Sequence, residues 1–134
     1  MVKVNGNIKL DHYKTVLSNG RHEMIGDEPT INGGSDLGFS PSELLCSALA
    51  TCTCVTLRMY ADKKQWNLKE VKTNVSFTRN VEKNTTSIGR EIELHGDLTE
   101  EQRERLLAIA NQCFMHKLLM NPIEIETKLV KQNL

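Results

Sequence analysis

The chain has 134 residues, with 17 Lys+Arg against 17 Asp+Glu and a formal net charge of zero. This length favours one domain, which we expect to span residues 1–134 and to bury its core without disulfides or metals. The balanced charge argues against nucleic-acid binding, because surfaces that bind phosphates are rich in Lys and Arg. Nor do the six aromatic residues favour a base-stacking platform.

The amino-terminal residues have no secretory pattern, because charges at Lys3, Lys9, Asp11 and Lys14 interrupt any apolar run. The stretch 44–57 is uncharged, but it is short and rich in Ser and Thr for a segment that crosses a bilayer. We therefore expect a soluble cytoplasmic protein with no membrane partner.

Residues 1–35 are expected to form two strands joined by turns, the first where Val2, Val4, Ile8 and Leu10 alternate loosely with polar residues. The triplet Ser18-Asn19-Gly20 is typical of a hairpin turn, and residues 22–25 make the returning strand. A long irregular loop follows, with glycines at Gly33 and Gly34 that allow unusual backbone angles.

A long helix is predicted from Pro41 to about Lys64. Ser40 and Glu43 have the spacing of a capping box, and Pro41 occupies the first helical position. Because residues 44–57 carry no charge on any face, we expect this helix to be central and buried all round.

Two strands are predicted next, because apolar and polar residues alternate over 71–78 and again over 88–95. On the second strand one face carries Ile88, Arg90, Ile92 and Leu94. A second helix is predicted from a capping box of Thr99 and Gln102, with an apolar stripe that includes Cys113 and ends before Pro122. A last strand is predicted over 123–129. The sequence therefore predicts an α+β fold of order β-β-α-β-β-α-β with antiparallel sheet.

Four cysteines need an explanation in such a protein, since cytoplasmic disulfides are transient or catalytic: Cys46, Cys52, Cys54 and Cys113. Cys52 and Cys113 lie on the apolar faces of separate helices, so they either pair as a redox dithiol or fill the core as small apolar residues. A zinc site built from Cys52, Cys54, Cys113 and His116 is a weaker alternative. Residues two apart on a helix point about 200° apart, which separates Cys52 from Cys54.

A reactive Cys52 needs a cation, because Cys52 lies 11 residues after Pro41 and is too far from the helix N-terminus. Arg58 points to another face of the helix. Arg21, after the hairpin turn, is the candidate if its loop folds over the helix, and a solvated turn residue is the alternative.

The segment from Ser40 to Cys52 resembles the central-helix motif of the OsmC/Ohr family, in which a Cys follows a Pro by 11 positions. The segment 110–119 around Cys113 resembles the second cysteine motif of that family, and 121–125 fits its tail. The likeness covers nearly the whole chain. It implies an OsmC-like fold in which antiparallel sheets pack around the central helix and two chains form an intertwined homodimer.

The resemblance also implies a thiol-dependent peroxidase acting in defence against oxidative stress. Cys52 would attack an organic hydroperoxide and become a sulfenic acid, and Cys113 would condense with it to a disulfide. A dithiol such as dihydrolipoamide would restore both thiols as an external reductant, with no bound cofactor or metal. An apolar pocket would favour alkyl or fatty-acid hydroperoxides.

The sequence departs from the peroxidase motif at three places. Ser42 stands where those members commonly carry a Glu that pairs with an Arg over the thiolate, and Glu43 is the nearest carboxylate. Arg21 does not match the spacing of the family's arginine, and Phe114-Met115 replaces Pro-Val after the second cysteine. The alternative is therefore a non-enzymatic protein of the same fold that binds an apolar ligand or senses redox state. Cys46 and Cys54 are expected to pack, and His116 is either a proton donor or a polar helix-end residue.

Overall fold

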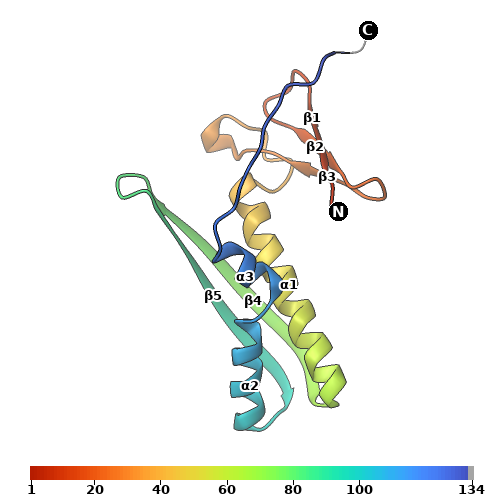
Figure 1. Ribbon diagram of the computed structural model, residues 1–134, viewed down its shortest axis with the longest axis vertical. Coiled ribbons are helices and arrows are strands. Elements are labelled where there is room, and N and C mark those ends of the chain that lie inside the picture. The colour runs from red at the N-terminus through yellow and green to blue at the C-terminus, as the bar shows by residue number, and fades with distance from the viewer. Residues whose placement is uncertain (133–134) are drawn as a thin grey trace.

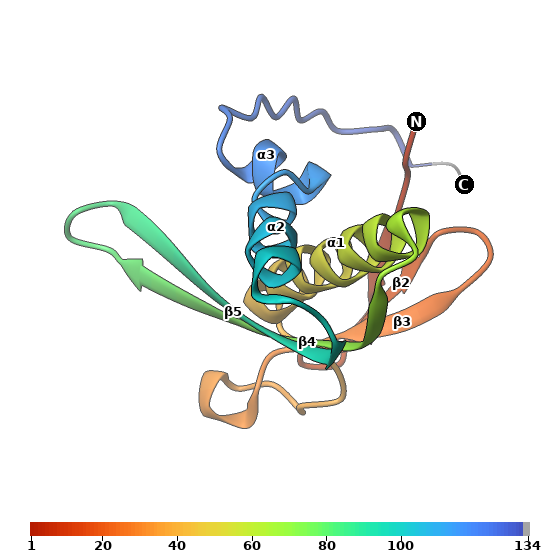
Figure 2. The ribbon, with the colours of Figure 1, turned by 90° about the horizontal axis from the view of Figure 1, so that it is seen from below.

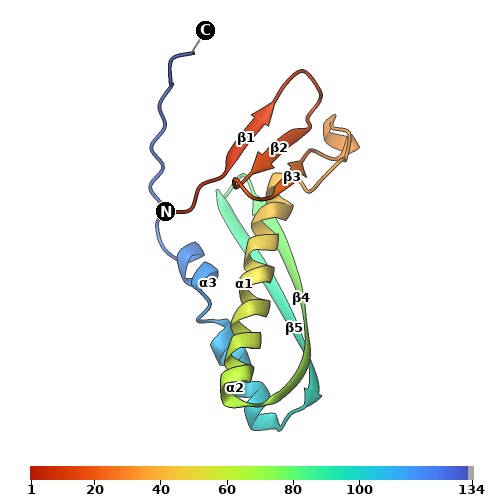
Figure 3. The same cartoon turned by 90° about the vertical axis from the view of Figure 1, so that its right-hand side faces the viewer.

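A computed structural model describes residues 1–132, which form an α+β fold with two antiparallel sheets and three α-helices (Figure 1). In chain order the elements are β1 (Asn5–Ile8), β2 (Thr15–Ser18), β3 (Glu23–Gly26), the 3-10 turn η1 (Thr30–Asn32), α1 (Pro41–Lys64), β4 (Asn67–Asn80), β5 (Thr85–Asp97), α2 (Glu100–Ala110) and α3 (Phe114–Leu119). Helices α1, α2 and α3 lie on one face of the long β4–β5 hairpin (Figures 2 and 3).

The amino-terminal sheet has three strands in the order β1-β2-β3, one more than the sequence predicts. The predicted hairpin turn is present, with Gly20 at φ 91° between β2 and β3. Strand β1 lies within the first predicted strand, although all four of its residues, Asn5-Gly6-Asn7-Ile8, are exposed, and the additional strand is β2. The sheet lies beyond the amino-terminal end of α1 (Figure 1).

Asp27 ties the loop after β3 together from a buried position. Its carboxylate accepts hydrogen bonds from the N–H groups of Tyr13 at 2.9 Å, Glu28 at 2.7 Å and Leu37 at 3.1 Å. Burial alone would raise the pKa of Asp27, but these bonds outweigh it and hold the pKa below its usual value.

We expect Asp27→Ala to destabilise the fold, because it leaves three backbone donors without their acceptor. The lowered pKa means that the charged carboxylate stabilises the folded state above the unfolded pKa of about 3.9, and that this contribution is lost as pH falls through the folded pKa. The difference in unfolding free energy between wild type and variant should therefore shrink on acidification below about pH 4. Urea unfolding at neutral and acidic pH measures this difference, and a pH-independent difference would contradict the assignment.

Helix α1 begins and ends as predicted, with Ser40 and Glu43 forming the complete capping box and Gln65 ending the helix in a left-handed conformation. Its buried residues form one stripe that faces β4 and α2: Leu49, Thr53, Leu57 and Ala61. On the opposite face Val55 is 45% exposed and Met59 is 67% exposed. Within a single chain the uncharged helix is therefore buried on one side rather than all round.

By length and composition alone, α1 is apolar enough to cross a membrane, with a mean hydropathy of 1.4 over its most apolar window. The core helix of a soluble protein meets the same criterion. In this fold α1 packs on β4 and α2, where it supplies Leu57 and Ala61 to the main buried core. The remaining core residues come from β4 and α2: Leu68, Leu106, Ile109 and Ala110.

The second predicted helix is two helices, which corrects the expectation of one continuous apolar stripe. Helix α2 starts at the predicted capping box of Thr99 and Gln102 and ends at Ala110. The chain then leaves the helical conformation, and Cys113 adopts φ −64° and ψ 149° as the N-cap of α3. Cys113 therefore lies at a break between helices rather than on a helix face.

The predicted last strand over 123–129 is also wrong for the single chain. Residues 123–132 form no strand and are exposed, although apolar and polar residues alternate over 123–129. A strand needs a neighbour for its backbone hydrogen bonds, and this segment has none in the part of the chain that the structure describes. It extends toward the same end of the molecule as the amino-terminal sheet (Figures 1 and 3).

Candidate active site

Cys52 lies in the middle of α1, on the side where α3 packs against that helix. Its side chain is half-buried, and its sulfur lies 4.0 Å from the hydroxyl oxygen of Thr56 one turn later. The thiol therefore occupies a junction of two helices while keeping some contact with solvent.

Cys113 comes to the same junction from the break between α2 and α3. It is 1% exposed, and its sulfur accepts a hydrogen bond from the N–H of His116 at 3.3 Å. The Cys113 side chain lies close enough to Cys52 to lower the pKa of the Cys52 thiol. The structure thus brings together the two cysteines that the sequence singled out.

The surroundings of Cys52 favour its thiolate. Partial burial raises the pKa of the Cys52 thiol, but the N–H groups of Met115 and Phe114, the thiol of Cys113 and the hydroxyl of Thr56 lower it further than burial raises it. The net effect is a pKa below the usual cysteine value. Because the thiolate is the nucleophile, this environment favours reaction at Cys52.

Arg90 of β5 is a cation beside Cys113, and it is not among the site residues predicted from the sequence. One guanidinium nitrogen, Nη1, lies 3.0 Å from Thr53 Oγ1 and 3.8 Å from Cys113 Sγ. The other, Nη2, lies 2.9 Å from Asn111 Oδ1 and 3.1 Å from His116 Nδ1. Its position in the alternating pattern could have identified it, because Arg90 is a charged residue on the strand face that also carries Ile88, Ile92 and Leu94.

His116 is joined to this cluster rather than free at a helix end. Its Nδ1 faces a guanidinium N–H, which can only donate, so this nitrogen acts as the acceptor. Its backbone N–H donates to Cys113. His116 therefore contacts Arg90 with its ring and Cys113 with its backbone N–H.

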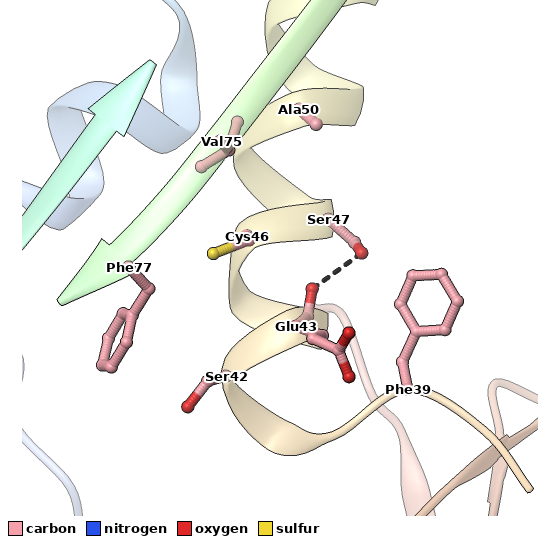
Figure 4. Close-up of a pocket in the computed structure, with 8 residues that line it drawn as sticks. All are labelled: Phe39, Ser42, Glu43, Cys46, Ser47, Ala50, Val75 and Phe77. Atoms are coloured by element: carbon pink, nitrogen blue, oxygen red, sulfur yellow. Dashed lines mark hydrogen bonds between the residues drawn. The ribbon is translucent and has the colours of Figure 1, made fainter. Parts of the chain in front are cut away.

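Two cavities flank the first half of α1. One, of about 560 Å³, approaches Cys113 through Arg90 and His116 and is otherwise mostly apolar; its walls are Leu45, Leu49, Thr86, Ile88, Arg90, Ile92, Leu107, Asn111, His116, Leu119 and Met120. The other, of about 420 Å³, lies near the start of the helix and is lined by Phe39, Ser42, Glu43, Cys46, Ser47, Ala50, Val75 and Phe77 (Figure 4). We associate the first with the chemistry, because its polar groups contact Cys113.

A sequence profile described as OsmC-like protein matches residues 33–128 of the chain. The chain belongs to the OsmC-like protein family. The matched residues include α1, the β4–β5 hairpin and both cysteines of the junction. No curated protein matches the chain by sequence comparison.

Solved structures with this fold share little sequence with this OsmC-like protein. An OsmC-like protein from Mycoplasma pneumoniae superposes with a TM-score of 0.77 at 18% identity, over 90% of this chain and 87% of the other. An organic hydroperoxide resistance protein OsmC from Legionella pneumophila gives 0.65 at 20% identity, over 89% and 88%. The organic hydroperoxide resistance protein OhrB of Bacillus subtilis gives 0.61 at 20% identity, over 88% and 89%. At these identities the likeness shows the shared fold.

In this OsmC-like protein, Arg21 and Glu43 do not join the cysteine pair within one chain. Arg21 lies exposed in the turn between β2 and β3, where its backbone N–H donates to the Asn19 side chain at 2.9 Å. Glu43 closes the capping box, with its carboxylate 2.9 Å from the Ser40 N–H, and this bond lowers the pKa of Glu43. Glu43 precedes Cys52 by nine residues, which is about 13 Å along a helix.

The remaining cysteines lie apart from the pair. The Cys54 sulfur faces β4, at 3.6 Å from Thr73 Oγ1, whereas Cys52 faces α3. Cys46 lines the smaller cavity, near Val75 and Phe77 (Figure 4). Among residues 1–132 no group of three or more His, Cys, Asp or Glu side chains is arranged to hold a metal ion. The zinc alternative is therefore not assembled in the described chain.

Proposed function

We propose that this OsmC-like protein is a thiol-dependent peroxidase that reduces organic hydroperoxides through Cys52 and Cys113. The observation that carries the proposal is the meeting of two cysteines at one helix junction, where a partly exposed Cys52 with a lowered pKa lies beside a buried Cys113. Membership in the OsmC-like family supports the same chemistry, as do two fold relatives that are named organic hydroperoxide resistance proteins.

The proposed cycle has three balanced steps. The Cys52 thiolate attacks the distal oxygen of the hydroperoxide, and the O–O bond breaks to give a sulfenic acid and an alcohol. The Cys113 sulfur then attacks Cys52, and the sulfenic oxygen leaves as water while the disulfide forms. An external dithiol reduces this disulfide and is itself oxidised to a disulfide.

The larger cavity supports an apolar substrate. Its volume of about 560 Å³ lies within the usual size range of small-molecule sites, and most of its walls are aliphatic side chains. An alkyl or fatty-acid hydroperoxide would bury its chain there, whereas hydrogen peroxide gains nothing from such walls.

We further propose that the working unit is a homodimer. One chain leaves large apolar side chains exposed on several elements: Leu45, Val55 and Met59 of α1, Leu107 of α2, Phe114 of α3, and Ile123, Ile125 and Leu129 after α3. The amino-terminal sheet contributes no residue to the main buried core. A second copy would cover these surfaces and give the last segment a strand to pair with.

Turnover of cumene hydroperoxide with a dithiol reductant tests the peroxidase. We expect multiple turnovers by the wild-type protein and preference for cumene hydroperoxide over hydrogen peroxide. No peroxide consumption by folded, fully reduced protein would overturn the proposal.

The pH dependence of this reaction follows from the lowered pKa of Cys52. Because the thiolate reacts, kcat/KM for the hydroperoxide should rise with pH and level off below about 8.5, the ordinary thiol pKa. Thr56→Val removes one hydroxyl that lowers the pKa, so it should move the curve to higher pH. Stopped-flow measurement of the first turnover from pH 5 to pH 9 gives the pH dependence of the rate for wild type and for Thr56→Val. If the two curves coincide, the role given to Thr56 is contradicted.

A non-enzymatic protein that binds an apolar ligand or senses redox state is the second candidate function. The positions of Arg21 and Glu43 favour it, because neither reaches Cys52 within the chain as the peroxidase motif would require. An apolar ligand retained through purification, no peroxide consumption and a Cys52 thiol pKa near 8.5 would support it over the peroxidase.

A further inference from the structure

The two sulfurs of the pair have different environments. Cys113 is 1% exposed and accepts hydrogen bonds from two donors, the His116 N–H at 3.3 Å and Arg90 Nη1 at 3.8 Å. Cys52 is half-buried and receives N–H groups from Met115 and Phe114. The guanidinium therefore lies on the Cys113 side of the pair.

The charge of Arg90 is available to that sulfur. Its other contacts are neutral acceptors, namely Thr53 Oγ1, Asn111 Oδ1 and His116 Nδ1. Within residues 1–132 no carboxylate lies within ion-pair distance of Arg90. A half-buried guanidinium without a carboxylate stabilises negative charge that develops next to it.

We infer that Arg90 serves the second cysteine: it stabilises the negative charge that develops on the Cys113 sulfur when the disulfide closes and when the disulfide is reduced. This inference rests on the proposed function. In closure the Cys113 sulfur attacks the sulfenic sulfur of Cys52, the S–O bond breaks, and the leaving hydroxide takes up the proton that Cys113 loses and departs as water. In reduction the Cys113 sulfur leaves with the electron pair of the S–S bond and remains in the cradle formed by Arg90 and the His116 N–H.

The same geometry decides which sulfur the reductant attacks. A dithiol approaches from solvent, so its thiolate reaches the half-buried Cys52 and not the buried Cys113. This step forms a mixed disulfide between the reductant and Cys52 and releases the Cys113 thiolate. The second thiol of the reductant then attacks the mixed disulfide, closes a disulfide within the reductant and releases the Cys52 thiolate.

The first experiment measures reduction of the disulfide without any peroxide. Wild type, Arg90→Met and Arg90→Lys are oxidised with diamide and then reduced with excess dithiothreitol under stopped-flow conditions. We expect Arg90→Met to reduce about 10- to 100-fold more slowly, the range for losing a hydrogen bond to a charged group, and Arg90→Lys to recover part of the rate. Arg79→Met is the matched control, because Arg79 lies on the same hairpin, is exposed and contacts Thr86 at 3.0 Å rather than a cysteine.

The second experiment separates the two half-reactions with one equivalent of cumene hydroperoxide. Arg90→Met should slow disulfide closure and reduction more than alcohol release, since Cys52 keeps its own donors. Its sulfenic acid should persist and be captured by dimedone on Cys52, whereas in wild type disulfide closure should compete with capture. Thermal unfolding of each variant checks that the fold is retained.

The site of attack is read by peptide mapping. Oxidised wild-type protein is mixed with one equivalent of 2-mercaptoethanol, quenched in acid and digested. We expect the mercaptoethanol adduct on Cys52. An adduct on Cys113 would overturn the inference about the leaving sulfur.

The outcomes distinguish failure of this inference from failure of the peroxidase proposal. If Arg90→Met alters dithiothreitol reduction but wild type consumes no peroxide, the peroxidase proposal fails and the role of Arg90 stands. If wild type turns over peroxide and Arg90→Met closes and reduces its disulfide at the wild-type rate, the inference about Arg90 fails alone. An equal loss in the peroxide step and in both disulfide steps would also overturn it.

Discussion

Replacement of Cys52 by serine is expected to reduce steady-state peroxide turnover by about 10³-fold or more, as for other enzymes that lose a covalent nucleophile. A serine hydroxyl stays protonated in the environment that lowers the pKa of the Cys52 thiol. It therefore offers no anion to attack the O–O bond. The rate of cumene hydroperoxide consumption with a dithiol reductant measures the loss.

Cys113→Ser should behave differently, because its cysteine acts after the peroxide has been cleaved. We expect this variant to release one alcohol per chain at close to the wild-type rate and then to stop with a sulfenic acid on Cys52. Dimedone capture should label Cys52 in Cys113→Ser and leave no sulfenic label in Cys52→Ser. The pair of variants thus assigns the attacking and the resolving roles separately.

Cys54→Ser provides the matched control for these substitutions. Cys54 lies two residues from Cys52 on the same helix, but its sulfur contacts Thr73 Oγ1 of β4 at 3.6 Å. We expect its turnover to remain within about threefold of wild type, because a serine hydroxyl can keep this contact. Full activity of Cys52→Ser would contradict the proposed nucleophile. Loss of activity in Cys54→Ser would indicate that the cysteine on the β4 side of the helix is also needed for turnover.

The helix starts were predictable because their chemistry is local. Ser40 with Glu43, and Thr99 with Gln102, satisfy backbone N–H groups three residues away, so the sequence carries the whole interaction. The pairing of Cys52 with Cys113 was also within reach, since both residues lie on apolar faces of the predicted helices and both stand in segments that resemble the cysteine motifs of the family.

The break before Cys113 was not predictable from pattern. The apolar stripe continues through Cys113 and Phe114, so periodicity favours one helix. In the structure Asn111 ends α2 while its side chain accepts a hydrogen bond from Arg90, 21 residues away on β5. This contact exists only after the strand and the helices have packed.

Arg90 itself was missed for a related reason. A charge on the apolar face of a strand is visible in the sequence, but the sequence does not say whether it snorkels to solvent or meets a partner. The partner is a sulfur 23 residues later, brought near by the break in the helix. The alternating pattern over 123–129 is likewise real, whereas the strand that would pair with it is absent from the described chain.

That unpaired segment leads to the second large expected effect, on assembly. We expect wild-type protein to sediment as a dimer at micromolar concentration and Ile125→Lys to shift it toward monomer. Ile125 is 84% exposed in the single chain, and burying an isoleucine stabilises an interface by about 1.5–3 kcal/mol. Because a twofold dimer contains the residue twice, the dissociation constant should rise by about 10²- to 10⁴-fold.

The control is Glu124→Gln, which changes the net charge by the same amount as Ile125→Lys but on the opposite face of the segment. Glu124→Gln and Ile125→Lys each add one positive charge, but Glu124 belongs to the polar set of the alternation. If the segment pairs as a strand with one buried face, Glu124→Gln should leave the dimer intact and Ile125→Lys should weaken it. Sedimentation velocity over a concentration series measures both constants. A wild-type monomer would refute the dimer, and equal weakening by both variants would show that charge rather than burial of the Ile125 face controls assembly.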